Sequence, residues 1–138
     1  MNRPAGYSGT PLAKKLGIKP GMTVGLIGAP REFREMLGEL PDGARLSAGA
    51  HARAALHIWF VRREVELGAG MARVVRLAGE SPVWIAWRKK TARPAPASGP
   101  DENAVRNAGL AAGLVDYKVC AIDETWSGLL FALRKPNG

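Results

Sequence analysis

The chain is poor in cysteine, and this limits the covalent chemistry that could hold it together. Cys120 is the one cysteine among 138 residues, so no disulfide can form within the chain. Chains without internal disulfides are typical of a reducing compartment. Cys120 lies between Val119 and Ala121 in an apolar run, and this context predicts a buried strand cysteine rather than a reactive thiol.

Long apolar runs are also missing. Residues 1–7 lack the apolar stretch of a signal peptide. No run approaches the roughly 18 apolar residues that a membrane-spanning helix requires. We therefore expect a cytoplasmic protein without a membrane partner.

Acidic residues are scarce relative to basic ones. Twelve Asp and Glu residues stand against 20 Lys and Arg residues, which gives a formal net charge of +8. Such an excess attracts nucleic acid, an acidic membrane face, phosphate-bearing ligands or an acidic partner. Solubility alone is the alternative explanation. A nucleic-acid partner would rest on this net charge together with Lys14, Lys15 and the basic segment 88–93.

Familiar catalytic and metal-binding patterns are absent. His51 and His57 stand six residues apart with no cysteine or carboxylate at ligand spacing, so we expect no metal site. His57 falls in a buried strand and is expected to be a hydrogen-bonded core histidine. The sequence has no serine in a nucleophile elbow, no P-loop, no helix-turn-helix and no RNA-binding aromatic signature.

What the sequence does contain is an alternation of apolar strands and amphipathic helices. The pattern predicts strands at 22–27, 44–48 (weak), 56–61, 82–87, 117–122 and 129–134. It predicts helices at 10–17, about 33–40, 63–78 and 101–113. Thr10 and Asp101 are expected N-caps, and Gly68 and Gly70 are expected to weaken the middle of the longest helix.

This order predicts one α/β domain over residues 1–138. We expect a Rossmann-like three-layer sandwich with a mostly parallel sheet and a C-terminal antiparallel strand. Residues 1–9 are expected to form an extended N-terminus. Residues 88–100 are basic and rich in proline and alanine, which predicts a flexible loop.

Three segments, 6–18, 83–90 and 109–129, carry a resemblance to a known family. The last contains the run Lys118-Val-Cys-Ala-Ile-Asp-Glu-Thr-Trp-Ser-Gly128. Together they resemble the small bacterial family called domain of unknown function 3052, which supports the fold and implies no activity. The order of elements also resembles the class I methyltransferase plan, shortened by the strand-and-helix unit after the weak second strand.

The carboxyl ends of the strands are where an open α/β sheet binds its ligand. Gly28 follows the first strand, but Pro30 removes one N–H donor from a cradle there. The weak strand 44–48 lacks the acidic residue that would bind a ribose. Both features speak against an S-adenosylmethionine site.

The same strand ends carry six basic residues, which we call the basic rim. They are Arg31, Arg62, Arg63, Arg88, Lys89 and Lys90. Guanidinium groups bind phosphates through paired hydrogen bonds, so the rim suits a phosphate or another polyanion. Alternatively, each charge marks only a strand leaving the core for water.

The final hairpin could add to this rim. Asp123 and Glu124 could form ion pairs with Lys89 or Lys90, or serve as acid and base. Trp126 could stack on a base or cover the core.

Three functions remain open at this point. The first is a non-catalytic or degenerate binder of a phosphate-bearing small molecule, using Gly28, the basic rim and Trp126. The second is a nucleic-acid-binding or regulatory interaction protein. The third is an S-adenosylmethionine-dependent methyltransferase relative that uses Asp123 or Glu124. The residues do not identify a cofactor or an oligomeric state, and they favour binding over catalysis.

Overall fold

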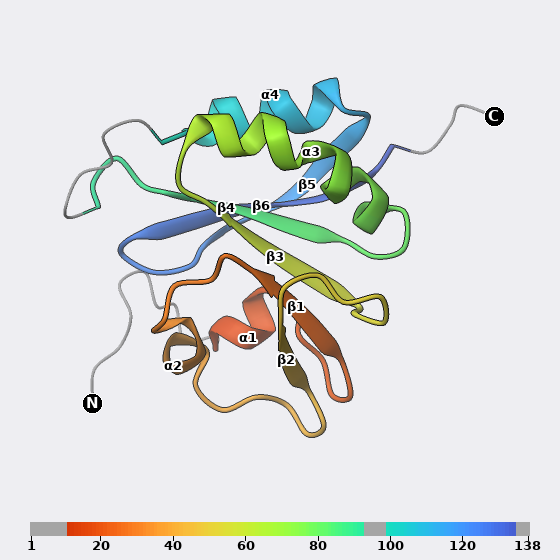
Figure 1. The fold of residues 1–138 in the computed structure, drawn as a ribbon. Coiled ribbons are helices and arrows are strands. Elements are labelled where there is room, and N and C mark those ends of the chain that lie inside the picture. The colour runs from red at the N-terminus through yellow and green to blue at the C-terminus, as the bar shows by residue number, and fades with distance from the viewer. Residues whose placement is uncertain (1–10, 93–98, 135–138) are drawn as a thin grey trace.

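Six strands form one mixed sheet in the computed structural model, which describes residues 11–92 and 99–134. Their order across the sheet is β2-β1-β3-β4-β6-β5 (Figure 1). The strands are β1 Thr23–Ile27, β2 Arg45–Ala48, β3 Leu56–Val61, β4 Val83–Arg88, β5 Leu114–Ala121 and β6 Trp126–Leu133. The first four run parallel, and β6 pairs antiparallel with both β4 and β5.

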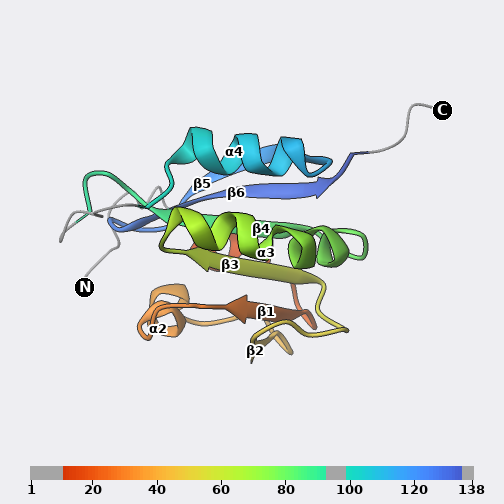
Figure 2. The same cartoon turned by 45° about the horizontal axis from the view of Figure 1, so that its top comes forward.

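Helices cover both faces of the sheet (Figures 1 and 2). One face carries α1 (Leu12–Lys15) and α2 (Phe33–Leu37), and the other carries α3 (Glu64–Ala78) and α4 (Glu102–Ala111). Each pair of helices closes its own apolar cluster against the sheet. The expected Rossmann-like three-layer α/β fold is therefore confirmed.

The central strand β3 shows why the sheet is buried on both sides. All six of its residues are buried. Ile58 and Phe60 pack with the α1 and α2 cluster, whereas Trp59 and Val61 pack with α3 and α4. A continuous apolar run is what a parallel strand between two helical layers requires.

The weak second strand forms, and β2 leads directly back into β3. Within the described ranges no further strand or helix stands between them, so the shortened methyltransferase plan is what the structure has. The last two strands begin earlier than expected. Trp126, Ser127 and Gly128 were expected in the connection, but they belong to β6 and pair with β4.

The segment 88–100, expected as a flexible loop, begins one residue later in the structure because β4 continues to Arg88. Arg88 is the last residue of β4, Lys89 N donates to Thr125 O at 2.8 Å, and Ala92 is buried. The segment thus starts beside the β5–β6 turn, and its flexibility stays a prediction. Residues 93–98, like the expected extended N-terminus 1–9 and the expected cap Thr10, lie outside the described residues.

Cys120 is buried on the α1 side of β5, as its apolar neighbours predict. Burial raises the pKa of its thiol, so the group stays protonated at neutral pH. Over the part of the chain that the structure covers, the helices are too short or too polar to cross a bilayer.

Candidate functional site

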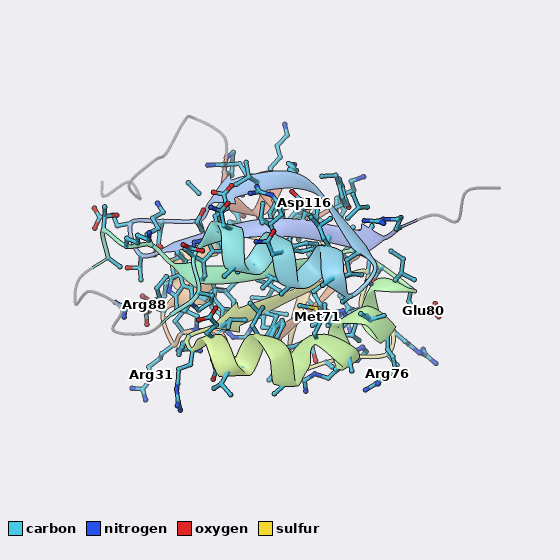
Figure 3. The ribbon with its side chains drawn as sticks, turned by 90° about the horizontal axis from the view of Figure 1, so that it is seen from above. Arg31, Met71, Arg76, Glu80, Arg88 and Asp116 are labelled. Carbon is cyan, nitrogen blue, oxygen red and sulfur yellow. The ribbon has the colours of Figure 1, made fainter. Side chains whose placement is uncertain are left out.

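The carboxyl ends of the four parallel strands meet at one edge of the sheet. Because β5 is antiparallel to β6, it also ends at this edge, and the β5–β6 turn joins it there. Figure 3 shows Arg31 and Arg88 at this end of the molecule and Arg76 and Glu80 at the other. The fold thus brings the basic rim to one end, as the parallel sheet predicts.

A pocket of about 350 Å³ opens between the ends of β1 and β2, and we call it the β1–β2 pocket. It is lined by Leu26, Gly28, Ala29, Pro30, Arg31, Phe33, Arg34, Ala48 and Gly49. The pocket lies at the carboxyl ends of the strands, the edge of an open α/β sheet where ligands bind, and it is next to the switch point between β1 and β3. Two of the lining residues are arginines and none is acidic.

Gly28 makes the turn that leads from β1 into the pocket. Its φ of +69° is a left-handed conformation that side chains disfavour. A Cβ here would also lie 3.2 Å from Phe60 O and 3.4 Å from Arg62 Nη1. The absent side chain therefore allows both the turn and the close approach of Arg62.

Arg31 and Arg34 both line the β1–β2 pocket and both are exposed. Within residues 11–92 and 99–134, neither arginine has a salt-bridge partner. The sequence did not predict Arg34 as a site residue. Its spacing of three from Arg31, at the start of an expected helix, was the signal that could have found it.

Arg62 crosses the gap between β1 and β3. Its Nη1 donates to Gly28 O at 2.7 Å, and its guanidinium carbon lies 5.3 Å from the centre of the Trp126 ring. The chain reverses its winding direction between these two strands, so this gap is the topological switch point. The guanidinium group of Arg62 therefore occupies the switch point, where a ligand of this fold would otherwise bind.

Trp126 is buried and packs edge-on against Phe60, with ring centroids 5.1 Å apart. It covers the core, which was one of the two expected roles, and Arg62 covers its remaining face. The ring is not available as an open stacking surface for a base.

Arg63 precedes α3, and the helix end beside it is already closed by a carboxylate. Glu66 Oε1 accepts from Arg62 N at 2.7 Å and from Arg63 N at 2.9 Å. These two backbone hydrogen bonds hold the pKa of Glu66 below its ordinary value. A ligand phosphate would have to displace Glu66 to use these donors.

Lys89 and Lys90 do not form the expected ion pairs with Asp123 and Glu124. Lys89 Nζ donates to the main-chain oxygen of Asp123 at 2.6 Å, and Lys90 lies 3.8 Å from Asp101. The expectation is wrong because the Asp123 carboxylate accepts hydrogen bonds within the β5–β6 turn. Its Oδ1 accepts from the backbone N–H of Thr125 and Trp126, at 2.8 and 2.7 Å.

A second hollow of about 590 Å³ lies at this part of the rim. Lys89 and Lys90 line it together with Asp101 and Glu102 of the α4 N-terminus. Asp101 accepts from Ala104 N at 2.9 Å, which lowers the pKa of its carboxyl group and confirms it as the N-cap. Arg88 is half-buried and takes part in an interaction within the fold. Charges of both signs therefore meet here, unlike in the β1–β2 pocket.

The two histidines contact each other near the start of β3, at the end of that strand away from the rim. His57 is buried, and its Nε2 accepts from His51 N at 3.1 Å. Its Nδ1 finds no partner among the described residues, so the expected core histidine is only half satisfied. In the same part of the chain, no group of three or more His, Cys, Asp and Glu residues is placed to hold a metal ion.

We expect His57 to make the protein less stable as the pH falls below about 6.5. Burial, followed by the charges of His51 and Arg73, lowers the pKa of folded His57 from its ordinary 6.5. As the pH falls, His57 therefore binds a proton in the unfolded chain before it does so in the folded chain. The free energy of unfolding then decreases by at most about 1.4 kcal/mol per pH unit. Unfolding midpoints in urea between pH 7.5 and 5 measure this loss.

The matched variants are His57→Gln and His51→Gln, which each remove one titrating ring. His57→Gln is expected to flatten the decline, whereas His51→Gln keeps most of it. An equally steep decline in His57→Gln would contradict the assignment.

Comparisons with known proteins support the fold and no closer relationship. No family model and no curated protein matches the chain. Membership of domain of unknown function 3052 therefore stays a prediction.

Three solved structures are similar in fold. An O-methyltransferase of neocarzinostatin biosynthesis (NcsB1), in complex with S-adenosylmethionine and a naphthoic acid, has a TM-score of 0.54 at 12% identity, over 83% of this chain and 49% of that one. A SAM-dependent methyltransferase from Aquifex aeolicus has a TM-score of 0.51 at 16% identity, over 87% and 86% of the two chains. A protein of the NADB-Rossmann superfamily from Streptococcus agalactiae has a TM-score of 0.56 at 6% identity, over 93% and 69%. The chain spans about half the length of the first of these. It shares a Rossmann-like fold with all three, and the first two support a methyltransferase-like plan.

Proposed function

We propose that the β1–β2 pocket binds a phosphate-bearing small molecule, such as a nucleotide, and that the protein transfers no methyl group. The observation that carries this proposal is the pair of exposed arginines, Arg31 and Arg34, in a pocket whose lining includes no carboxylate. Arginine binds phosphate oxygens through paired, charge-assisted hydrogen bonds. Unpaired arginines in a concave site favour an anion.

The end of β2 supports the same ligand class. Rossmann-type sites that bind an unmodified ribose use an acidic residue at this point, and an arginine nearby accommodates a phosphate instead. Here β2 ends at Ala48 and is followed by Gly49, and the charged groups across the pocket are Arg31 and Arg34. A pocket with arginines, and without an acidic residue at the end of β2, favours a phosphate over an unmodified ribose.

S-adenosylmethionine is the competing ligand, because two of the structurally similar proteins are methyltransferases that depend on it. Its sulfonium is a cation, and the two pocket arginines oppose a cation. Gly28 O and the face of the Trp126 ring could contact a cation, but the guanidinium of Arg62 already occupies that position. The carboxylate of Asp123 is engaged in its own turn, which removes one of the two expected acid–base residues.

A long polyanion fits the rim less well than a compact ligand. The rim is interrupted by acidic side chains at the N-termini of α3 and α4, where Glu66 and Asp101 satisfy the backbone donors. A nucleic-acid backbone crossing from Arg31 to Lys90 would pass these carboxylates. Along the described part of the rim, the β1–β2 pocket is where positive charge occurs without a carboxylate in the lining.

Calorimetric titration with ADP, adenosine and S-adenosylmethionine tests the proposal. We expect ADP to bind and adenosine to bind at least tenfold more weakly, because charge-assisted hydrogen bonds to phosphate each contribute about 1.5–3 kcal/mol. The double variant Arg31→Gln/Arg34→Gln is expected to lose at least tenfold in ADP affinity.

The matched control is Arg76→Gln, which removes an exposed arginine at the opposite end of the molecule (Figure 3). It should leave ADP binding unchanged. Equal affinities for ADP and adenosine would refute a phosphate site. Tighter binding of S-adenosylmethionine than of ADP would establish the competing function.

A further inference from the structure

The outer side of β2 is an open sheet edge. β2 is the last strand on its side, and no strand pairs with its outer side in the ranges 11–92 and 99–134. Arg45 N donates to Met22 O at 2.8 Å and Gly49 N to Leu26 O at 2.6 Å. Because backbone groups alternate between the two sides of a strand, those of Leu46 and Ala48 point away from β1.

One face beside this edge is a basic hollow of about 720 Å³. It is lined by Thr23, Arg45, Leu46, Ser47, His51, Ala52 and Arg53. Arg45 and Arg53 are exposed and have no salt-bridge partner in the part of the chain that is described. The lining includes no carboxylate, so the hollow favours acidic side chains.

Helix packing explains why this face is open. α3 packs on β3, β4 and β6, and α4 packs on β4, β5 and β6. The longer methyltransferase plan inserts a strand-and-helix unit after the second strand, and no such unit stands between β2 and β3 in the described residues. The short segment 49–55 therefore connects the two strands at the β2 side of the sheet.

The opposite face beside the same edge is apolar. Leu46 is half-buried there, and it packs against the α1 and α2 cluster with Met22, Leu40 and Ala44. An added strand would thus meet arginines on one face and apolar side chains on the other. Because side chains alternate between faces along a strand, the complementary segment alternates acidic and apolar residues.

The other edge of the sheet is less suited to strand addition. β5 carries an irregularity between Asp116 and Lys118, where the pairing register with β6 shifts. Edge bulges and lysines hinder the approach of a further strand. β2 pairs with β1 in unbroken register.

We propose that the β2 edge binds an extended, acidic segment of a partner protein by strand addition. The main-chain groups of Leu46 and Ala48 would supply hydrogen bonds, and Arg45 and Arg53 would select acidic side chains. This surface lies at β2 and the segment before β3, separate from the lining of the β1–β2 pocket apart from the end of β2.

The test uses a fluorescent peptide of four Val-Glu repeats and the full chain, measured by fluorescence anisotropy. We expect it to bind at least tenfold more tightly than a peptide of four valines followed by four glutamates, which has the same charge. Arg45→Glu/Arg53→Glu should lose this binding. Amide hydrogen exchange should show new protection at Leu46 and Ala48.

Two controls separate strand addition from general attraction of a polyanion. N-methylation of every second peptide residue, tested in both registers, should weaken binding in one register by removing main-chain donors. Arg31→Gln/Arg34→Gln should bind the peptide normally, so failure of the phosphate proposal would leave this one standing. Equal binding of the repeat and block peptides, or protection elsewhere than β2, would overturn the proposal.

Discussion

Replacement of Trp84 by alanine is expected to lower the free energy of unfolding by about 3–5 kcal/mol. Trp84 is fully buried in β4, among the largest side chains of the α1 and α2 cluster. Its Nε1 donates to Leu16 O at 2.9 Å, across 68 positions of sequence. The variant would lose the packing of the ring and leave the carbonyl at the end of α1 without its donor.

Trp84→Phe separates these two losses. It keeps most of the apolar contact and removes the hydrogen bond, so we expect a smaller loss of about 1–3 kcal/mol from the unsatisfied carbonyl and the reduced volume. Urea unfolding followed by circular dichroism measures both variants. A loss below about 1 kcal/mol in Trp84→Ala would show that α1 is not held by this ring.

The contact between Trp84 and Leu16 illustrates what the sequence could not predict. Apolar runs were sufficient to predict the strands β1, β3 and β4, because a strand buried on both faces consists almost entirely of apolar residues. The spacing of apolar residues was sufficient to predict the helices. The partner of an indole N–H depends on which helix crosses which strand. That choice is made by packing in three dimensions, and local patterns do not record it.

The same distinction runs through the candidate site. The parallel sheet predicted that basic residues after several strands would share one edge, and they do. It did not predict that Arg62 would bind Gly28 O, or that Lys89 would bind the Asp123 main-chain oxygen. Side-chain partners at a rim are chosen among many groups within reach, so charge counts alone overstate the number of free cations.

Two glycines in the middle of α3 are expected to respond to alanine in opposite directions. From the sequence, Gly68 and Gly70 both weaken the helix, and both replacements would stabilise it. The structure distinguishes them. A Cβ at Gly68 meets nothing within 4 Å, whereas one at Gly70 would lie 2.5 Å from Cζ2 and 2.7 Å from Cη2 of Trp59.

Gly68→Ala is therefore expected to raise the free energy of unfolding by up to about 1 kcal/mol, the difference in helix propensity. Gly70→Ala is expected to lower it by about 1–3 kcal/mol, because the buried Trp59 ring must shift within a packed layer. Unfolding in urea compares the two variants with the parent chain. If Gly70→Ala were as stable as Gly68→Ala, α3 would not lie this close to β3, and the packing that carries Arg62 and Glu66 to the rim would have to be revised.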